Sequence, residues 1–373
     1  MLDRYKLMQE IERVSDKLFV DFSVEKNIAR EVWKKISDDP TFKYKVAEID
    51  SSLIIPSWQG RLDDLFDITK NIEKYVVLSV DGSQIYPDRH HGTMCNLINI
   101  GTVQLRYGLP GKAVIFNSEP HLFVGYEDAD LNESPKELVN CRRQEFEFLF
   151  GFEIATAVKP TDIPTVLLFD GSLIFWHLES KSFEVKQKFL SSYLHVLKQF
   201  YDKKMLIAGY ISLPKSKELL NLIRVALCDF VVENCSQCKE VDHLVDSQIA
   251  GFYLQPFTRT TIFKNYSKIT KYYPKEVHPH FFYMHVGDEI FRIEIPAWIA
   301  QDKQKVDMIC TVIADQTIKG MGYPVALAES HEQAVVKGAD REFFYHLIDK
   351  IGMEQNRVSI ISQKSRKKLG MGI

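Results

Sequence analysis

The sequence predicts an α/β protein with a mixed sheet flanked by helices and with an N-terminal helical arm. Three strand candidates follow one another at 76–80, 93–106 and 112–117. The turn sequences PDRHHG and YGLPGK separate them, which is typical of an antiparallel meander. Beyond residue 135, helical and strand-like stretches alternate, as they do where crossover helices join strands of one sheet.

The N-terminal part, residues 1–38, has the apolar spacing of two helices. A looser segment follows, punctuated by Pro40, Pro56 and Gly60. We therefore expect a helical arm and linker over residues 1–75, which serves either as a packing arm or as a docking surface. The apolar positions of the two helices are Leu2, Tyr5, Leu7, Met8, Ile11 and Val14, then Ile28, Val32 and Ile36.

The central part continues after the meander with helices and strands in turn. This order is the one found in ribonuclease-H-like folds, so we expect such a domain over residues 76–335. The expected elements are a helix at 135–158, the strand TVLLF from Thr165, a helix at 183–202, a strand at 205–210, a helix at 215–226 and a strand near 228–232.

The C-terminal part adds two strands, at 281–286 and 290–295, and a helix at 302–318. A last long helix is expected at 331–350. Residues 336–373 then form the end of this helix and the basic tail SQKSRKKLGMGI.

Composition excludes some classes of protein and leaves others open. The chain has 373 residues, of which 45% are hydrophobic and 26% charged, with a formal net charge of −3. Any binding to nucleic acid would therefore come from local basic patches. No apolar stretch is long enough to span a membrane, and the charged N-terminus has no secretory signal, so we expect a cytoplasmic protein.

Six cysteines are scattered along the chain and do not form a disulfide framework. Cys235 and Cys238 form a C-x-x-C pair, with Cys228 upstream and His243 downstream. This pattern is an incomplete zinc signature because a second close pair is missing. The sequence favours ordinary reduced thiols and leaves zinc open.

Two similar segments, VVLSVDGSQIY at 76–86 and TVLLFDGSLIF at 165–175, each place an aspartate directly after an apolar strand. If both strands belong to one sheet, Asp81 and Asp170 lie side by side. One Asp-Gly-Ser alone indicates a turn. Two crowded carboxylates repel each other, and a divalent cation relieves that repulsion. The pair therefore favours a metal site.

A third carboxylate is expected from the helix at 135–158, which runs antiparallel to the Asp170 strand. That strand covers roughly 17 Å, a length that needs about eleven helical residues. Counting back from Val158 leads to Glu147, while Glu153 would lie nearer the other end of the strand and remains an alternate ligand.

The two Asp-Gly-Ser strands resemble those of the NurA family of DNA double-strand-break repair nucleases. Three further stretches support the resemblance, which covers most of residues 76–335. They are GYISLPKS at 209–216, FRIEIPAW at 291–298 and YPVALAESHEQA at 323–334.

The resemblance implies a ribonuclease-H-like fold, a manganese-dependent nuclease and a homodimer that works on a hexameric HerA-type translocase. The family's acidic metal ligands match Asp81 and Asp170, and its glutamate matches Glu147 or Glu153. A Tyr–His pair of the family's C-terminal motif matches Tyr323 and His331.

The residues around that histidine also suggest a phosphate site. Ser330 and Gln333 have the spacing of an S-x-x-Q capping box, which predicts that the last helix starts at His331. A histidine at a helix N-terminus is placed to orient a phosphate or to protonate a leaving oxygen.

DNA contacts are expected from basic residues near strands and aromatics. The segment RTTIFKNYSKITKYYPK at 259–275 interleaves both residue types, which suits single-stranded DNA as well as an ordinary solvated face. The candidates are Lys215, Arg259, Lys264, Lys268 and Arg292, although a structural ion pair with Glu294 explains Arg292 equally well.

These observations together predict a DNA nuclease, an exonuclease on DNA ends and endonuclease on single strands, with two Mn²⁺ (or Mg²⁺) ions per site. The chain has no Walker A sequence, so any ATP-driven movement must come from the partner. DNA end processing and phage defence both remain open as roles. The alternatives are an actin-like phosphotransferase and a non-catalytic subunit that binds DNA or a translocase.

Overall fold

The computed structural model describes residues 2–18, 21–49, 51–88, 95–124, 133–159, 162–231 and 236–355. Within these ranges, eleven strands form one mixed sheet, and most neighbouring strands are antiparallel. No helix of the described ranges is long and apolar enough to cross a membrane.

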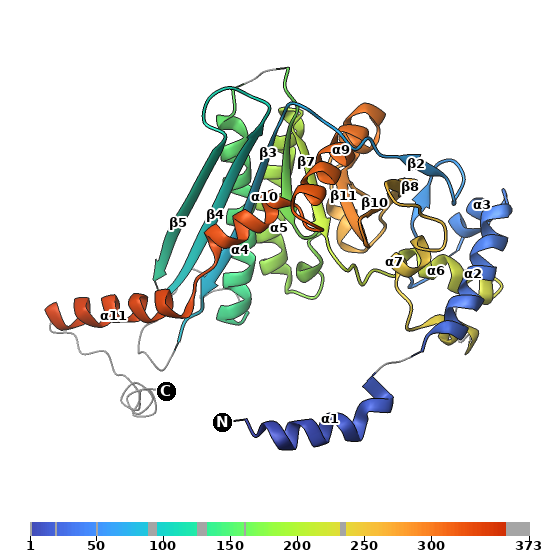
Figure 1. Ribbon diagram of the computed structural model, residues 1–373, viewed down its shortest axis with the longest axis horizontal. Helices are drawn as coiled ribbons and strands as arrows, with labels where there is room; N and C mark the ends of the chain where they lie inside the picture. Colours follow the sequence, from blue (N-terminus) through green and yellow to red (C-terminus); the bar gives the residue numbers. More distant parts are fainter. Residues whose placement is uncertain are drawn as a thin grey trace.

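The main path of the sheet runs β1-β9-β10-β11-β7-β6-β3-β4-β5, and β2 and β8 pair beside it (Figure 1). The predicted meander is confirmed as β3, β4 and β5, and β6 and β7 join β3 as parallel strands. The strands are β1 (Ser57–Trp58), β2 (Leu65–Asp67), β3 (Tyr75–Ile85), β4 (Cys95–Tyr107), β5 (Val114–Val124), β6 (Thr165–Asp170), β7 (Leu206–Ile211), β8 (Thr258–Thr260), β9 (Phe263–Lys264), β10 (Pro279–Val286) and β11 (Glu289–Pro296).

Helices cover both faces of the sheet: α4 packs on one face of β3 and β4, with α5 beside it, and α10 packs on the other face (Figure 1). The serine caps of α4 and α5, Ser134 and Ser182, accept hydrogen bonds from N–H groups of the first turn, which fixes where these helices begin. The helices are α1 (Arg4–Leu18), α2 (Ser23–Asp38), α3 (Phe42–Ala47), α4 (Pro135–Ala157), α5 (Phe183–Asp202), α6 (Glu218–Leu227), α7 (Asp246–Ala250), α8 (Ala297–Ala300), α9 (Lys303–Lys319), α10 (Val325–Ala334) and α11 (Gly338–Glu354).

The buried apolar side chains form two clusters, which share strand β10. The central core packs β3, β6 and β7 against α4, α5 and α9, and the lateral core packs α2, α6 and α7. Along β10, Phe282 and Met284 belong to the central core, whereas Phe281 and Tyr283 belong to the lateral core. This alternation follows from the two-residue period of a strand, so β10 separates the two cores.

The N-terminal helices differ in their packing. Trp33 and Ile36 of α2 are buried in the lateral core, so this helix is part of the folded body. Helix α1 lies apart from the rest of the molecule (Figure 1), and most of its apolar side chains are exposed.

Two predicted elements are wrong. Residues 228–230 form turns with positive φ at Asp229 and Phe230, so no strand starts there, and 232–235 lie outside the described residues. The last helix does not start at His331, because α10 already begins after Pro324 and a second helix, α11, follows it.

Candidate active site

Asp81 and Asp170 lie on neighbouring parallel strands. The ladder between β3 and β6 runs from the pair Val76–Thr165 to the pair Val80–Phe169. The two aspartates are the next residue on each strand, so they are adjacent where the parallel pairing ends. Such an edge, at the carboxyl end of parallel strands, is where α/β proteins bind their ligands.

Glu147 approaches this edge from helix α4. A Cβ added to Gly82 would lie 2.8 Å from the Glu147 Oε1 atom and 2.8 Å from the Arg143 Cγ atom. Only a glycine leaves room for the Glu147 carboxylate beside β3. Arg143, one helical turn earlier, forms an ion pair with Glu147 and donates to the Gly82 carbonyl.

The pKa of Glu147 is raised to about 7. Burial is the largest cause, and the negative charges of Asp81 and Asp170 add to it, while Arg143 opposes the rise. Glu147 therefore lies within electrostatic reach of both aspartates. Arg143 was not anticipated from the sequence, although its four-residue spacing from Glu147 was a usable signal.

Asp170 has its own partner in Tyr323, whose hydroxyl donates to its carboxylate. The Tyr323 ring packs edge-on against Tyr210, the residue of β7 that pairs with Asp170. The pKa of Asp170 is raised by burial and by Asp81, and the Tyr323 bond lowers it. Because the Asp170 side chain is also accessible to solvent, water screens part of this rise.

Asp81 is held from the other face of the sheet by His331. The His331 Nδ1 atom lies 2.8 Å from the Asp81 Oδ2 atom, and 60% of the histidine side chain is exposed. Helix α10 comes this close because Gly101, which pairs with Asp81, has no side chain: a Cβ there would lie 2.5 Å from the Ser330 carbonyl oxygen.

The predicted capping box is wrong. Ser330 is buried inside α10, with its hydroxyl 2.8 Å from the Ser79 hydroxyl, so it does not cap a helix that starts at His331. His331 instead lies in the last turn of α10, where the helix dipole does not favour a phosphate. Its placement beside Asp81 comes from the packing of α10 on β4.

Glu153 does not join the three carboxylates, since it lies on an exposed part of α4. Two predicted DNA contacts are also wrong. Arg292 is 2% exposed and pairs with Glu218 and Glu294, and Arg259 is 3% exposed and pairs with Asp307. Buried guanidinium groups that are already paired with carboxylates are not available to phosphates.

The remaining basic candidates are accessible. Lys268 is exposed, and Lys264 is half-buried with its ammonium 5.0 Å from the centre of the Tyr266 ring. Lys215 is exposed in the loop before α6, so it does not open that helix.

Of the cysteine pattern, the structure describes Cys228, at the C-terminal end of α6, and His243. Cys228 is disulfide-bonded, which differs from the expected reduced thiol. The side chains of Cys235 and Cys238 lie outside the described residues. The His243 Nδ1 atom lies 2.9 Å from a Glu25 carboxylate oxygen.

The carboxylates fit a hard divalent cation in donor type and in charge. Within the part of the chain that the structure describes, no three acidic, histidine or cysteine side chains already form a closed metal-binding group. Burial raises the pKa values of Glu147 and Asp170, and the negative charges of the neighbouring carboxylates add to both rises. Carboxylate oxygens suit Mg²⁺ and Mn²⁺, so Asp81, Glu147 and Asp170 are the residues that would hold such an ion.

Comparisons with known proteins identify a family. The sequence model of the NurA domain matches residues 75–336. A crystal structure of NurA aligns with a TM-score of 0.42 and 12% identity over 95% of this chain and 99% of the other. A crystal structure of NurA bound to dAMP and manganese aligns with a TM-score of 0.38 and 11% identity over 92% of this chain and 97% of the other. No curated protein matches the sequence.

Proposed function

This chain belongs to the NurA family, and we propose that it is a metal-dependent nuclease that hydrolyses DNA phosphodiester bonds. The observation that carries the proposal is the approach of Asp81, Glu147 and Asp170 at the end of the parallel ladder. The proposed role is the processing of DNA ends, in repair or in phage defence, in the cytoplasm.

In the proposed mechanism, Asp81, Glu147 and Asp170 would hold two divalent cations, with Mn²⁺ preferred over Mg²⁺. When bound, these ions would supply Lewis acidity and activate water for attack. Tyr323 keeps the Asp170 carboxylate oriented, and Arg143 keeps the Glu147 carboxylate beside Gly82. His331 is exposed next to Asp81, where its ring can contact a phosphate or give a proton to a leaving oxygen.

The test is cleavage of end-labelled single- and double-stranded DNA with Mn²⁺, with Mg²⁺ or with chelator. We expect cleavage that requires the metal and is abolished in Asp81→Ala and in Asp170→Ala, with both variants folded. Cleavage that persists in chelator or in both variants would refute the carboxylate site. DNA-independent turnover of a nucleotide would indicate a phosphotransferase, and DNA binding without cleavage a non-catalytic subunit.

We further propose that Lys264 and Lys268 contact single-stranded DNA, and that Lys215 contacts a phosphate. Neutralising Lys264, Lys268 and the exposed Lys271 together should weaken single-strand binding and flatten its salt dependence, by about one unit of slope per lost contact. An unchanged slope would assign these lysines to an ordinary solvated face.

We also propose that the protein is a homodimer and that helix α1 docks it to a HerA-type hexameric translocase. The exposed apolar residues Leu2, Tyr5, Met8 and Ile11 support this role for α1. Deleting residues 1–18 should leave cleavage of short single strands intact and weaken co-purification with the hexamer. A truncated protein that binds the hexamer as tightly as the full chain would move the docking surface elsewhere.

A further inference from the structure

The turn that follows Asp170 crosses over strand β7. Gly171 has φ +133°, a backbone conformation that favours glycine, and its N–H donates to the Tyr210 carbonyl at 2.9 Å. A Cβ added to Gly209 of β7 would lie 2.4 Å from the Gly171 carbonyl oxygen. A glycine in the turn and a glycine on β7 thus allow residues 171–173 to lie directly on β7.

The turn ends on the carboxylate of Glu294, which lies on β11 beyond β7. One oxygen, Oε2, accepts from the Ser172 hydroxyl at 2.6 Å and from the Leu173 N–H at 2.8 Å. Glu294 is fully buried and pairs with Gly209 in the sheet. The carboxylate therefore anchors the two residues that follow Asp170-Gly171.

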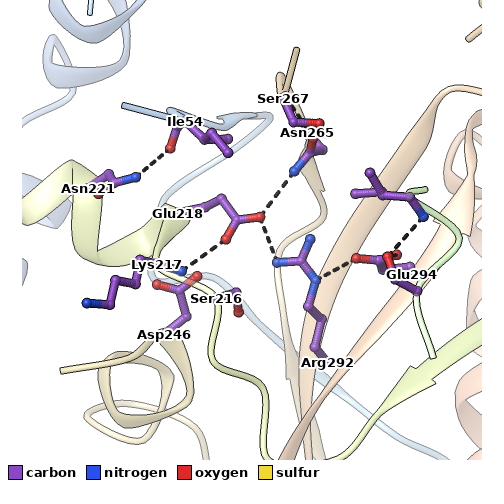
Figure 2. A network of polar contacts seen from close by, with 12 residues as sticks. Ile54, Ser216, Lys217, Glu218, Asn221, Asp246, Asn265, Ser267, Arg292 and Glu294 are labelled. Carbon is purple, nitrogen blue, oxygen red and sulfur yellow. Dashed lines mark hydrogen bonds and ion pairs between the residues drawn. The ribbon is translucent and has the colours of Figure 1, made fainter. Parts of the chain in front are cut away.

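Glu294 is itself held by a chain of charges that reaches the lateral core (Figure 2). The Arg292 Nε atom donates to Glu294 Oε1 at 2.9 Å, and the Arg292 Nη1 atom donates to Glu218 Oε1 at 2.9 Å. Asn265 donates to the same Glu218 oxygen at 3.1 Å. A buried carboxylate with hydrogen bonds on both oxygens has one orientation open to it.

We propose that Glu294 is a positioning residue for Asp170: it holds the Gly171–Leu173 turn on β7 and so fixes where the Asp170 carboxylate meets a divalent cation. This inference rests on the proposed function, because it assigns Asp170 to a metal ion. Outer partners that orient metal ligands typically change metal affinity by about 10–100-fold when they are substituted.

The same strand offers a matched control. Glu289 of β11 accepts from the Ser212 hydroxyl at 2.7 Å and from the Leu213 N–H at 2.8 Å, the same two contacts with the turn after β7. That turn holds none of the proposed metal ligands. If such contacts only stabilise turns, the two glutamates should behave alike toward the metal.

The experiment measures Mn²⁺ binding to the metal-free full chain from the electron paramagnetic resonance signal of free Mn²⁺. Circular dichroism confirms that each variant is folded at the temperature used. We expect Glu294→Gln and Gly209→Ala to weaken Mn²⁺ binding about 10–100-fold. In Glu294→Gln, the NH₂ group replaces one of two oxygens that both accept hydrogen bonds, so it faces a donor of either Arg292 or the turn. Glu289→Gln should remain within about twofold of the wild type, because it changes only the other turn.

If either of the first two variants fails to fold, Ser172→Ala replaces it. This change removes the bond that the half-buried hydroxyl donates to Glu294, together with the bonds it accepts from the Ile174 N–H and the Trp176 ring N–H. Wild-type Mn²⁺ affinity in every folded variant of the Asp170 turn would overturn the positioning role. Equal losses in Glu289→Gln would do the same. Asp170→Ala is measured alongside: if it also binds Mn²⁺ like the wild type, the proposed metal site itself is wrong.

Discussion

The segments Asp81-Gly82-Ser83 and Asp170-Gly171-Ser172 follow similar apolar runs, yet the backbone takes a different course through each. At the first segment, strand β3 continues to Ile85 and stays paired with β4 throughout. At the second, strand β6 ends at the aspartate, and the chain turns over β7 toward Glu294.

A glycine is therefore required in each segment for a different structural reason. Gly82 keeps an ordinary strand conformation and leaves space for the Glu147 carboxylate. Gly171 has open space around its missing side chain but a positive φ. The two aspartates also have separate partners on separate elements, His331 for Asp81 and Tyr323 for Asp170. Similar tripeptides can thus bring two carboxylates together by unlike means.

The largest expected effect concerns the carboxylate for which Gly82 leaves room. Glu147→Gln should reduce metal-dependent cleavage to background, because it removes one of the three proposed ligands. Glu153→Gln on the same helix should stay within about twofold, since its side chain is exposed away from the aspartates. Rates on one labelled substrate at saturating Mn²⁺ measure both variants. The reverse ranking would mean that the gap at Gly82 serves packing only.

The next prediction separates the two glycines directly. Gly82→Ala should push the flexible end of Glu147 away and lower activity on the order of 100-fold, as expected for a displacement of about 1 Å. Its stability should change little. Gly171→Ala should instead lower the free energy of unfolding by about 1–3 kcal/mol, because alanine rarely adopts this φ. Paired rate and denaturation measurements test this, and equal stability losses would contradict it.

The sequence was sufficient to predict the long elements and the meeting of the carboxylates. Apolar periodicity identified α5 at its observed bounds, and the strand-length count led to Glu147 rather than Glu153. Both inferences use only the regular spacing of residues along one helix or strand, which can be read from the sequence.

The rest depends on contacts between distant segments. Arg259 looked like a surface charge because its partner Asp307 lies far away in the sequence. For Arg292 the sequence left DNA contact and a pair with Glu294 open; the structure shows that pair and adds the distant Glu218. The strands β1, β2, β8 and β9, two or three residues each, are too short to have a period. Ser330 matches a capping box by spacing alone, but Pro324 starts the helix earlier.

The partners of the two aspartates should also differ in kind. Tyr323→Phe removes the hydroxyl that orients Asp170. It should therefore raise the Mn²⁺ concentration at the midpoint of the cleavage titration about 10-fold and leave the rate at saturating Mn²⁺ unchanged. His331→Gln should lower that saturated rate about 10-fold and leave the Mn²⁺ midpoint nearly unchanged, because the exposed ring faces solvent beside Asp81. Mn²⁺ titrations of the cleavage rate separate the two effects. Identical shifts would show that both groups act through one shared site.

The smallest effect is a pH dependence of stability in metal-free protein. The pKa of Glu147 is raised from 4.5 to about 7 in the folded state. Between these values the folded protein binds a proton that the unfolded chain has lost, so the free energy of unfolding falls as pH rises. This part of the loss is at most about 3 kcal/mol.

Substituting either aspartate should therefore move the pH range over which the free energy of unfolding falls. Asp81→Asn and Asp170→Asn each remove a negative charge near Glu147, which lowers its pKa and shifts the loss of stability to lower pH. The shift should be larger for Asp81, whose effect on Glu147 is the greater of the two. Glu147→Gln should flatten the window, while the slope from Asp246, whose burial raises its pKa to about 7, should persist in all three variants. Denaturation from pH 5 to pH 8 in chelator measures these slopes. If neither aspartate variant moves the pH range over which stability is lost, the charges of Asp81 and Asp170 do not act on Glu147. The two segments would then differ in backbone conformation only.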